Sequence, residues 1–223
     1  MSQTDSAARN LSIDSTFNAI TSRRRRRILA FVGERREGGI DRLSVDEVAR
    51  ELAAEERGKP VASITTDEHE ERRTALVHVE LPLLEDAGLL SWDREADAVS
   101  LPDDLVLDGA TIRKTTERND TNWDAVFEAL ANERRRVALA VLDEASEPLS
   151  VAVLASEVAA ETGADETDVR ITLTHQHLPA LEASGLVTVG EKGVMYADNH
   201  LEDGIVDTDF DTPSRPLVAG TSL

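Results

Sequence analysis

Arginine is the residue in this sequence best suited to contact another macromolecule. Two dense clusters, residues 23–27 and 134–136, carry positive charge that could meet phosphate groups. Two predicted helices also hold side chains of the types that recognise bases, since arginine binds guanine and glutamine binds adenine through paired hydrogen bonds. These side chains are Arg72, Arg73, Thr74, Arg170, Thr172, Thr174 and Gln176. The residue types are compatible with nucleic-acid binding.

Ion pairing within the protein is the alternative role for the same arginines. The chain of 223 residues has 44 Asp and Glu against 24 Lys and Arg, a formal net charge of −20. Arg72, Arg73 and Arg170 could pair with carboxylates of their own helices on a solvated face. The two clusters could pair in the same way across the domain or across the interface between the repeats. The residue types leave both interpretations open.

Catalytic and metal-binding patterns are absent from the sequence. It has no cysteine, no glycine-rich phosphate loop, no Gly-x-Ser-x-Gly and no His-Glu-x-x-His. His175 and His177 lie two residues apart and would point to different faces of a helix, so they form a weak metal pair. We therefore expect no catalytic residue, no metal site and no cofactor, and a protein that is not an enzyme.

Three blocks of the sequence occur twice in the same order. Residues 17–32 align with 127–142, residues 43–53 with 149–159, and residues 78–90 with 175–187. Such self-similarity indicates a duplicated domain. We predict a mobile tail over 1–10, a first domain over 11–107, a linker over 108–120, a second domain over 121–199 and an acidic mobile tail over 200–223.

Each repeat predicts four helices followed by a short β-hairpin, and the fold class is therefore mainly α with small β-hairpin wings. Polar residues that favour helix starts precede three of the helices. In repeat 1 they are Ser12 or Asp14, Ser22 and Ser44, and in repeat 2 they are Thr121, Asn132 and Ser150. The fourth helix covers about 67–86 or 165–183, contains a proline that predicts a kink, and ends at Gly88 or Gly185. The predicted strands are 89–92 with 98–101, and 186–189 with 194–196.

Two runs of sequence carry a resemblance to a known family. Ala-Leu-Ala-Asn-Glu-Arg-Arg-Arg at 129–136, and Leu-Pro-x-Leu-Glu-x-x-Gly-Leu at 81–89 and 178–186, resemble the winged helix-turn-helix domains of ArsR-type transcriptional regulators. They are more similar still to a haloarchaeal family of ArsR-like domains with no assigned function. The resemblance covers residues 11–101 and 121–197 and implies two tandem winged helix-turn-helix domains. The acidic, lysine-poor composition likewise resembles halophilic proteins.

This resemblance implies a DNA-binding protein that regulates transcription. The fourth helix of each domain would enter the major groove of double-stranded promoter DNA. ArsR-like proteins pair through their first helices, so the repeats could act as an internal pseudo-dimer on a pseudo-palindromic site, with further homodimerisation left open. The candidate DNA contacts are Arg72, Arg73, Thr74, Arg134, Arg135, Arg136, Arg170, Thr172, Gln176 and Lys192. The net charge does not exclude them, because the Debye length falls to about 3 Å in molar salt.

A protein-interaction module without DNA contact is the competing hypothesis. The fourth helix of repeat 1 begins with the acidic run 67–71, and its wing at 93–97 has three acids against one arginine. These features suit a protein partner better than phosphate, whereas repeat 2 has the neutral wing pair Glu191 and Lys192. The sequence also has no signal peptide and no apolar stretch long enough for a membrane, which predicts a cytoplasmic protein without a membrane partner.

Overall fold

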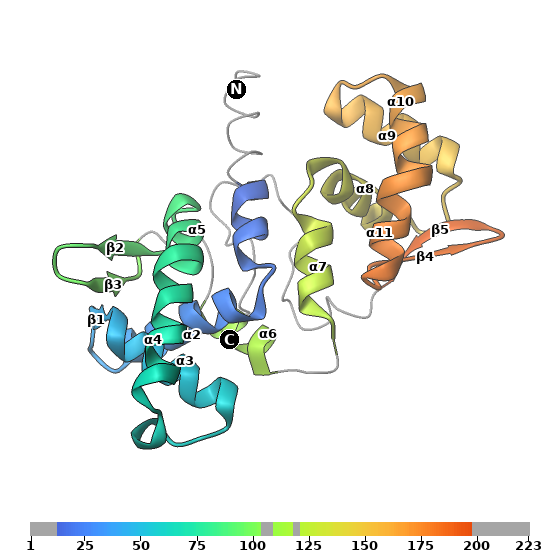
Figure 1. Cartoon of the computed structure of the whole chain (residues 1–223). Helices are drawn as coiled ribbons and strands as arrows, with labels where there is room; N and C mark the ends of the chain where they lie inside the picture. Colours follow the sequence, from blue (N-terminus) through green and yellow to red (C-terminus); the bar gives the residue numbers. More distant parts are fainter. Residues whose placement is uncertain (1–12, 104–108, 118–120, 198–223) are drawn as a thin grey trace. The chain divides into compact units, whose positions relative to one another are not determined.

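The computed structural model describes residues 13–103, 109–117 and 121–197 (Figure 1). Within them the protein is mainly helical with two small antiparallel sheets, which confirms the coarse fold class. The chain divides into two compact units. The repeat 1 unit comprises residues 22–118, and the repeat 2 unit comprises residues 1–21 with 119–223. The predicted tails over 1–10 and 200–223 lie outside the described residues.

The repeat 1 unit has helices against a three-stranded sheet of order β1-β3-β2. Its helices are α2 (Arg23–Glu37), α3 (Val45–Arg57), η1 (Val61–Ser63), α4 (Thr66–Ala75), η2 (Leu76–Glu80), α5 (Leu81–Asp86) and α6 (Gly109–Glu117). Its strands are β1 (Leu43–Ser44), β2 (Ser91–Asp93) and β3 (Ala98–Ser100). Helices α4, η2 and α5 follow one another without a break and correspond to the predicted fourth helix.

The repeat 2 unit shows the same order of elements. It contains α7 (Trp123–Leu130), α8 (Glu133–Glu144), α9 (Val151–Thr162), α10 (Glu166–Thr172), η3 (Leu173–His177), α11 (Leu178–Ala183), β4 (Val187–Gly190) and β5 (Gly193–Tyr196). A bridge from Leu149 to Val194 takes the place of the pairing between β1 and β3. A helix over residues 13–20 also belongs to this unit.

Local sequence explains most of the helix ends. The Ser44 and Ser150 side chains accept hydrogen bonds from backbone N–H groups of α3 and α9, as predicted. Gly88 and Gly185 have φ of 70° and 75°, a left-handed conformation that glycine adopts without strain. One predicted cap was wrong: α7 is capped by the side chain of Asn122 rather than by Thr121.

A π-helical turn occurs at the same place in both repeats. The turns η2 and η3 come directly before α5 and α11, whose second residues are Pro82 and Pro179. Proline has no N–H to donate and crowds the carbonyl four residues earlier. The wider π turn relieves this crowding, so the predicted kink takes the form of a local change in helical pitch.

The compact units differ from the predicted domain boundaries in two places. The helix over residues 13–20 packs in the repeat 2 unit, where the Phe17 ring lies 6.3 Å from that of Phe127 in α7. The predicted linker contains α6, which packs against α2, and Arg23 Nη2 donates to the Thr116 carbonyl at 2.9 Å. Burial of the apolar face of the first helix against its counterpart in the second repeat explains the difference, because linear order does not fix which neighbour covers a helix.

Aliphatic side chains make up most of both cores, together with the buried rings of Phe17, Phe31, Trp123 and Phe127. Ile28, Leu43, Leu76 and Leu84 are almost completely buried in the repeat 1 unit, and the repeat 2 unit buries leucine and valine in the same way. No helix among the described residues is long and apolar enough to cross a membrane.

Candidate nucleic-acid interface

Matching backbone features align the repeats residue by residue. The π turns begin at Leu76 and Leu173, so Arg73 and Arg170, three residues before each turn, are equivalent. Asp97 and Lys192 each directly precede the last strand of their repeat, and are equivalent as well. This alignment allows the charges around Arg73 to be compared with those around Arg170.

The third pair of positions follows from the helix caps. Ser44 and Ser150 are the N-caps of α3 and α9. Asp46 and Ala152, two residues later in each repeat, are therefore equivalent.

Two carboxylates hold Arg73 in the repeat 1 unit. Arg73 Nε lies 2.8 Å from Asp46 Oδ1, and Arg73 Nη2 lies 2.7 Å from Asp97 Oδ2. The hydrogen bond to Asp97 is the main cause that raises the pKa of Arg73 above its usual value, and Asp46 adds to it. We call Arg73, Asp46 and Asp97 the carboxylate clamp. Its geometry engages Arg73 through both Nε and Nη2.

The other candidates of repeat 1 are also poorly placed to meet DNA. Arg72 is buried and forms an ion pair with the buried Glu80. Thr74 is exposed, but Glu70 and Glu71 are exposed on the same helix. The α4 surface is therefore acidic where it is accessible.

Repeat 2 has no carboxylate clamp. The positions of Asp46 and Asp97 are taken by Ala152 and Lys192, so one acid is lost and the other is replaced by a cation. Arg170 and Lys192 are exposed, and neither forms an ion pair with any residue that the structure describes. Both cations are accessible at positions that are neutralised in repeat 1.

Arg170 lies on an exposed helix face of five residues, none of which is acidic, and the exposed Glu166 lies one turn before Arg170 without forming an ion pair with it. This repeat 2 helix face consists of Thr167, Arg170, Ile171, Thr174 and His175, all of which are exposed. Their spacing is that of one side of a helix. Glu70 stands in repeat 1 where Thr167 stands here. Of the face, Thr167, Ile171 and His175 were missed as candidates, although helical spacing from Arg170 leads to them.

Thr172 and Gln176 differ in their accessibility. The Thr172 hydroxyl donates to the carbonyl of Asp168 at 3.0 Å and accepts from Arg134 Nη1 at 3.3 Å. Arg134 also pairs with Asp168 at 3.0 Å, so both residues link α8 to α10. Gln176 is exposed beside the repeat 2 helix face.

Arg135 and Arg136 have structural roles as well. Arg135 Nη2 donates to the Glu128 carbonyl at 2.7 Å, and burial lowers the pKa of this arginine. Arg136 is 2% exposed, pairs with Asp14 and lies over the Phe17 ring. The arginine cluster of repeat 2 therefore holds the unit together, in line with the ion-pairing alternative.

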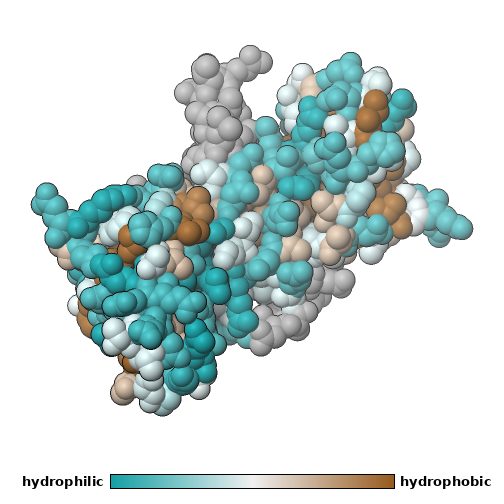
Figure 2. Space-filling view, in the orientation of Figure 1, coloured by the Kyte–Doolittle hydropathy of each residue, from teal (hydrophilic) through white to brown (hydrophobic). Residues whose placement is uncertain are grey.

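The histidines give no sign of a metal centre. His177 is buried, and its pKa is lowered first by this burial and then by the charge of Arg135, whereas His175 is exposed. No three ligand side chains of the described chain converge on a point that could hold a metal ion. The surface in Figure 2 is hydrophilic with separate small apolar patches, as expected for a surface rich in charged residues.

The duplication appears again when the chain is compared with known families. A single family model, described as "Domain of unknown function (DUF7344)", matches residues 17–100 and residues 127–195. The two matches begin at Phe17 and Phe127, the equivalent residues whose rings stack in the structure. No curated protein and no solved structure matches the chain. Because the matches cover more than half of its length, the chain belongs to the family described as Domain of unknown function (DUF7344), with two copies of the domain.

Proposed function

We propose that each repeat is a winged helix-turn-helix domain, related to the ArsR-type regulators, and that the protein binds double-stranded promoter DNA through repeat 2. The order of elements supports this: helix, short strand or bridge, two helices and a closing hairpin occur in both units. In such domains the second helix of the motif enters the major groove. In repeat 2 that helix is α10 with η3, which carries the repeat 2 helix face.

The replaced clamp is the observation that carries the proposal. An arginine between two carboxylates gains little from leaving them for DNA, whereas an exposed arginine can bind guanine with two hydrogen bonds. Arg170 is in the second situation and Arg73 in the first. Lys192 adds a cation on the wing, where contact with phosphate would position the domain. The protein would therefore contact bases through Arg170 of repeat 2, whereas Arg73 of repeat 1 would stay bound to its carboxylates.

The pairing of the first helices supports the pseudo-dimer. Phe17 and Phe127 are equivalent residues and contact each other, as residues near the axis of a two-fold interface do. One chain would then resemble a dimer with a single active reading helix. A pseudo-palindromic promoter would be occupied by two chains, each reading one half-site.

The test is to build the clamp into repeat 2. Ala152→Asp combined with Lys192→Asp should hold Arg170 as Arg73 is held, and promoter affinity should fall about tenfold or more. Arg170→Ala should have a similar effect. Binding is measured by fluorescence anisotropy on the protein's own promoter and on a scrambled duplex, in KCl at several concentrations. Arg73→Ala is the matched control in repeat 1 and should leave binding unchanged.

Three results would contradict the proposal. They are equal affinity for promoter and scrambled DNA, unchanged binding after the clamp is installed, and a loss with Arg73→Ala as large as that with Arg170→Ala. Circular dichroism of each variant separates these outcomes from misfolding.

A protein-docking role for repeat 1 is the second candidate. Its wing is tied internally, because Arg42 pairs with Asp93 at 2.6 Å and Arg94 pairs with Glu85 at 2.7 Å. The accessible acids of α4 then suit a basic protein partner. Glu70→Lys together with Glu71→Lys should abolish capture of such a partner and leave promoter binding intact, whereas loss of promoter binding would argue against the division of roles.

A further inference from the structure

A cavity of about 860 Å³ opens among α2, α3 and α4 of the repeat 1 unit. This volume lies within the range of small-molecule sites. Its apolar lining comes from Leu52, Ala53 and Ala75, and charged side chains form the rest. A ligand there would meet an apolar surface on one side and charges on the other.

The N-terminal part of α2 contributes three arginines to one wall. Arg23, Arg24 and Arg27 all line the cavity, and Arg24 and Arg27 pair there with Glu56 and Glu55 of α3. The first turn of α2 has no acidic residue, and Ser22 makes no capping hydrogen bond with its side chain. Cations at the positive end of a helix dipole are unfavourable, so an anion beside them is stabilising.

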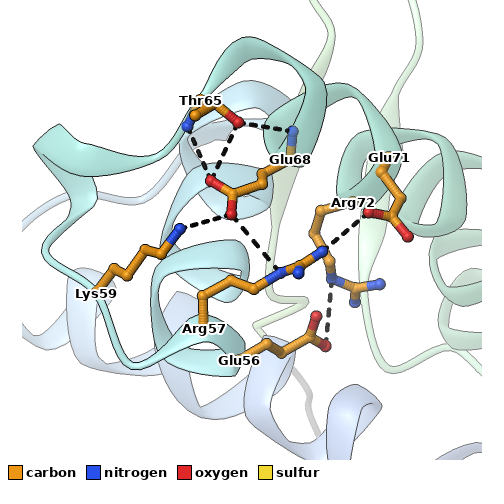
Figure 3. Close-up of polar contacts among 7 residues, drawn as sticks. All are labelled: Glu56, Arg57, Lys59, Thr65, Glu68, Glu71 and Arg72. Carbon is orange, nitrogen blue, oxygen red and sulfur yellow. Dashed lines mark hydrogen bonds and ion pairs between the residues drawn. The ribbon is translucent and has the colours of Figure 1, made fainter.

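The opposite wall joins α3 to α4 through the network in Figure 3. Arg57 lies 3.1 Å from Glu71 and 4.0 Å from Glu68, and Lys59 lies 2.8 Å from Glu68. The hydrogen bonds from Lys59 and then from the Thr65 backbone lower the pKa of Glu68 to about 2. Glu68 therefore stays charged and fixes this end of the cavity.

Arg72 supplies a buried donor at the cavity. Its side chain is 5% exposed and lines the cavity. Its Nε has no hydrogen-bond acceptor among the described residues, and the Glu56 carboxylate is 3.8 Å away. Buried donors are normally satisfied, so an acceptor at this place is favoured.

Repeat 2 shows that the fold does not need three of these arginines. The positions of Arg23, Arg27 and Arg72 are occupied there by Glu133, Val137 and Val169, whereas Arg24 is retained as Arg134. Three of the four cavity acids, Glu55, Glu68 and Glu71, have the acidic counterparts Glu161, Asp165 and Asp168, whereas Glu56 corresponds to Thr162. Arg27 pairs with Glu55, and repeat 2 keeps this acid without the arginine, so neutralisation of Glu55 alone does not explain Arg27.

We propose that this cavity binds a small molecule that carries phosphate groups and an apolar portion. Arginine is the side chain whose planar fork matches phosphate oxygens. Arg24 has one ion-pair partner and a side chain that is 62% exposed, so it can turn from Glu56 toward the ligand, and Arg57, which is 48% exposed, lines the opposite wall. The apolar portion would lie on Leu52, Ala53 and Ala75. This site is independent of the DNA-binding face of repeat 2.

Titration calorimetry of the full chain with pyrophosphate and with ADP, at constant ionic strength in KCl, tests the proposal. We expect saturable binding of one ligand per chain, with ADP tighter than pyrophosphate because it adds an apolar portion. Arg27→Val, which introduces the residue of repeat 2, should weaken binding at least about tenfold, and Arg57→Ala should do the same. Arg42→Ala removes an exposed arginine of the same unit outside the cavity, and should bind as the unaltered protein does.

The proposal is overturned if neither probe saturates, or if Arg42→Ala weakens binding as much as Arg27→Val. Equal affinity for the unaltered protein and both cavity variants would also overturn it. Thermal unfolding of each variant without ligand identifies any loss of fold, and Arg57→Ala, at an exposed position, preserves the test if Arg27→Val is unstable.

Discussion

At the scale of single residues, the two repeats bury different side chains at equivalent positions. Repeat 1 buries the pair Arg72 and Glu80, and the equivalent positions of repeat 2 are Val169 and His177. A buried ion pair is weak evidence for stability, since desolvation offsets most of the attraction. Repeat 2 shows that the same place in the fold accepts a largely apolar pair.

Removing one partner of the pair should be far more harmful than replacing both. We predict that Arg72→Val lowers the free energy of unfolding by about 3–5 kcal/mol, because Glu80 is left charged and buried. Arg72→Val with Glu80→Leu should recover most of this loss. Urea unfolding at pH 7 measures both. A double variant as unstable as the single one would show that the pair itself, rather than the unpaired charge, determines the result.

Glu68 should make stability depend on pH in an acidic window. Its pKa of about 2 lies below the ordinary value of 4.5, first through Lys59 and then through the Thr65 N–H. A depressed pKa contributes stability above pH 4.5 that is lost as pH falls toward 2. Glu68→Gln preserves a capping side chain and removes the charge. We expect the unaltered protein to exceed this variant in urea unfolding at pH 6, with the difference shrinking below pH 4.5. A difference independent of pH would refute this assignment.

At the scale of elements, two glycines differ in whether the backbone conformation requires glycine. Gly88 has a positive φ, whereas Gly33 has helical geometry that alanine can also adopt. Gly88 ends α5 at a φ of 70°, and nothing lies within 4 Å of a Cβ built there. Gly33 lies inside α2, where a Cβ would make an ordinary 3.7 Å contact with Leu101. We predict that Gly88→Ala costs about 1–2 kcal/mol of unfolding free energy. Gly33→Ala should add about 0.5–1 kcal/mol. Thermal unfolding measures both, and effects of the same sign would contradict the prediction.

Short-range sequence patterns predict the helices and their caps well. They do not predict which side chains pair over long sequence distances. Ser44, Ser150 and Gly88 act within a few residues of themselves, so their roles can be recognised locally. The fate of Arg73 depends on Asp46 and Asp97, which are 27 and 24 residues away. Only the fold places these acids beside it. The sequence could therefore identify both arginines as candidates, but it could not show that Arg73 is bound by two carboxylates and that Arg170 is not.

The same limit applies to the arginine clusters and to the domain boundaries. Arg136 pairs with Asp14, which lies 122 residues away, and no local sequence pattern predicts this contact. The helix over residues 13–20 is the first helix of repeat 1 in the sequence but is grouped with the repeat 2 unit. Because the sequence is duplicated, the first helix of each copy has the same kind of apolar face, and the two helices can pack against each other.

At the scale of the whole molecule, this grouping predicts where a mutation near the N-terminus will act. Phe17 is completely buried and stacks on Phe127. Phe17→Ala should cost about 3–5 kcal/mol of stability, and the loss should appear in the repeat 2 unit although the residue belongs to repeat 1 in the sequence. Hydrogen exchange resolved by segment measures this, with faster exchange expected in α7 and α8 and unchanged exchange in α3.

Phe31→Ala is the matched control, since Phe31 is 4% exposed within α2 of the repeat 1 unit. It should accelerate exchange in α2 and α3 and spare α7 and α8. Local opening reports the cooperative unit to which a residue belongs. If Phe17→Ala instead loosened α3 and left α7 protected, the first helix would belong to repeat 1. Pairing of the first helices, and the pseudo-dimer proposed from it, would then lose their support.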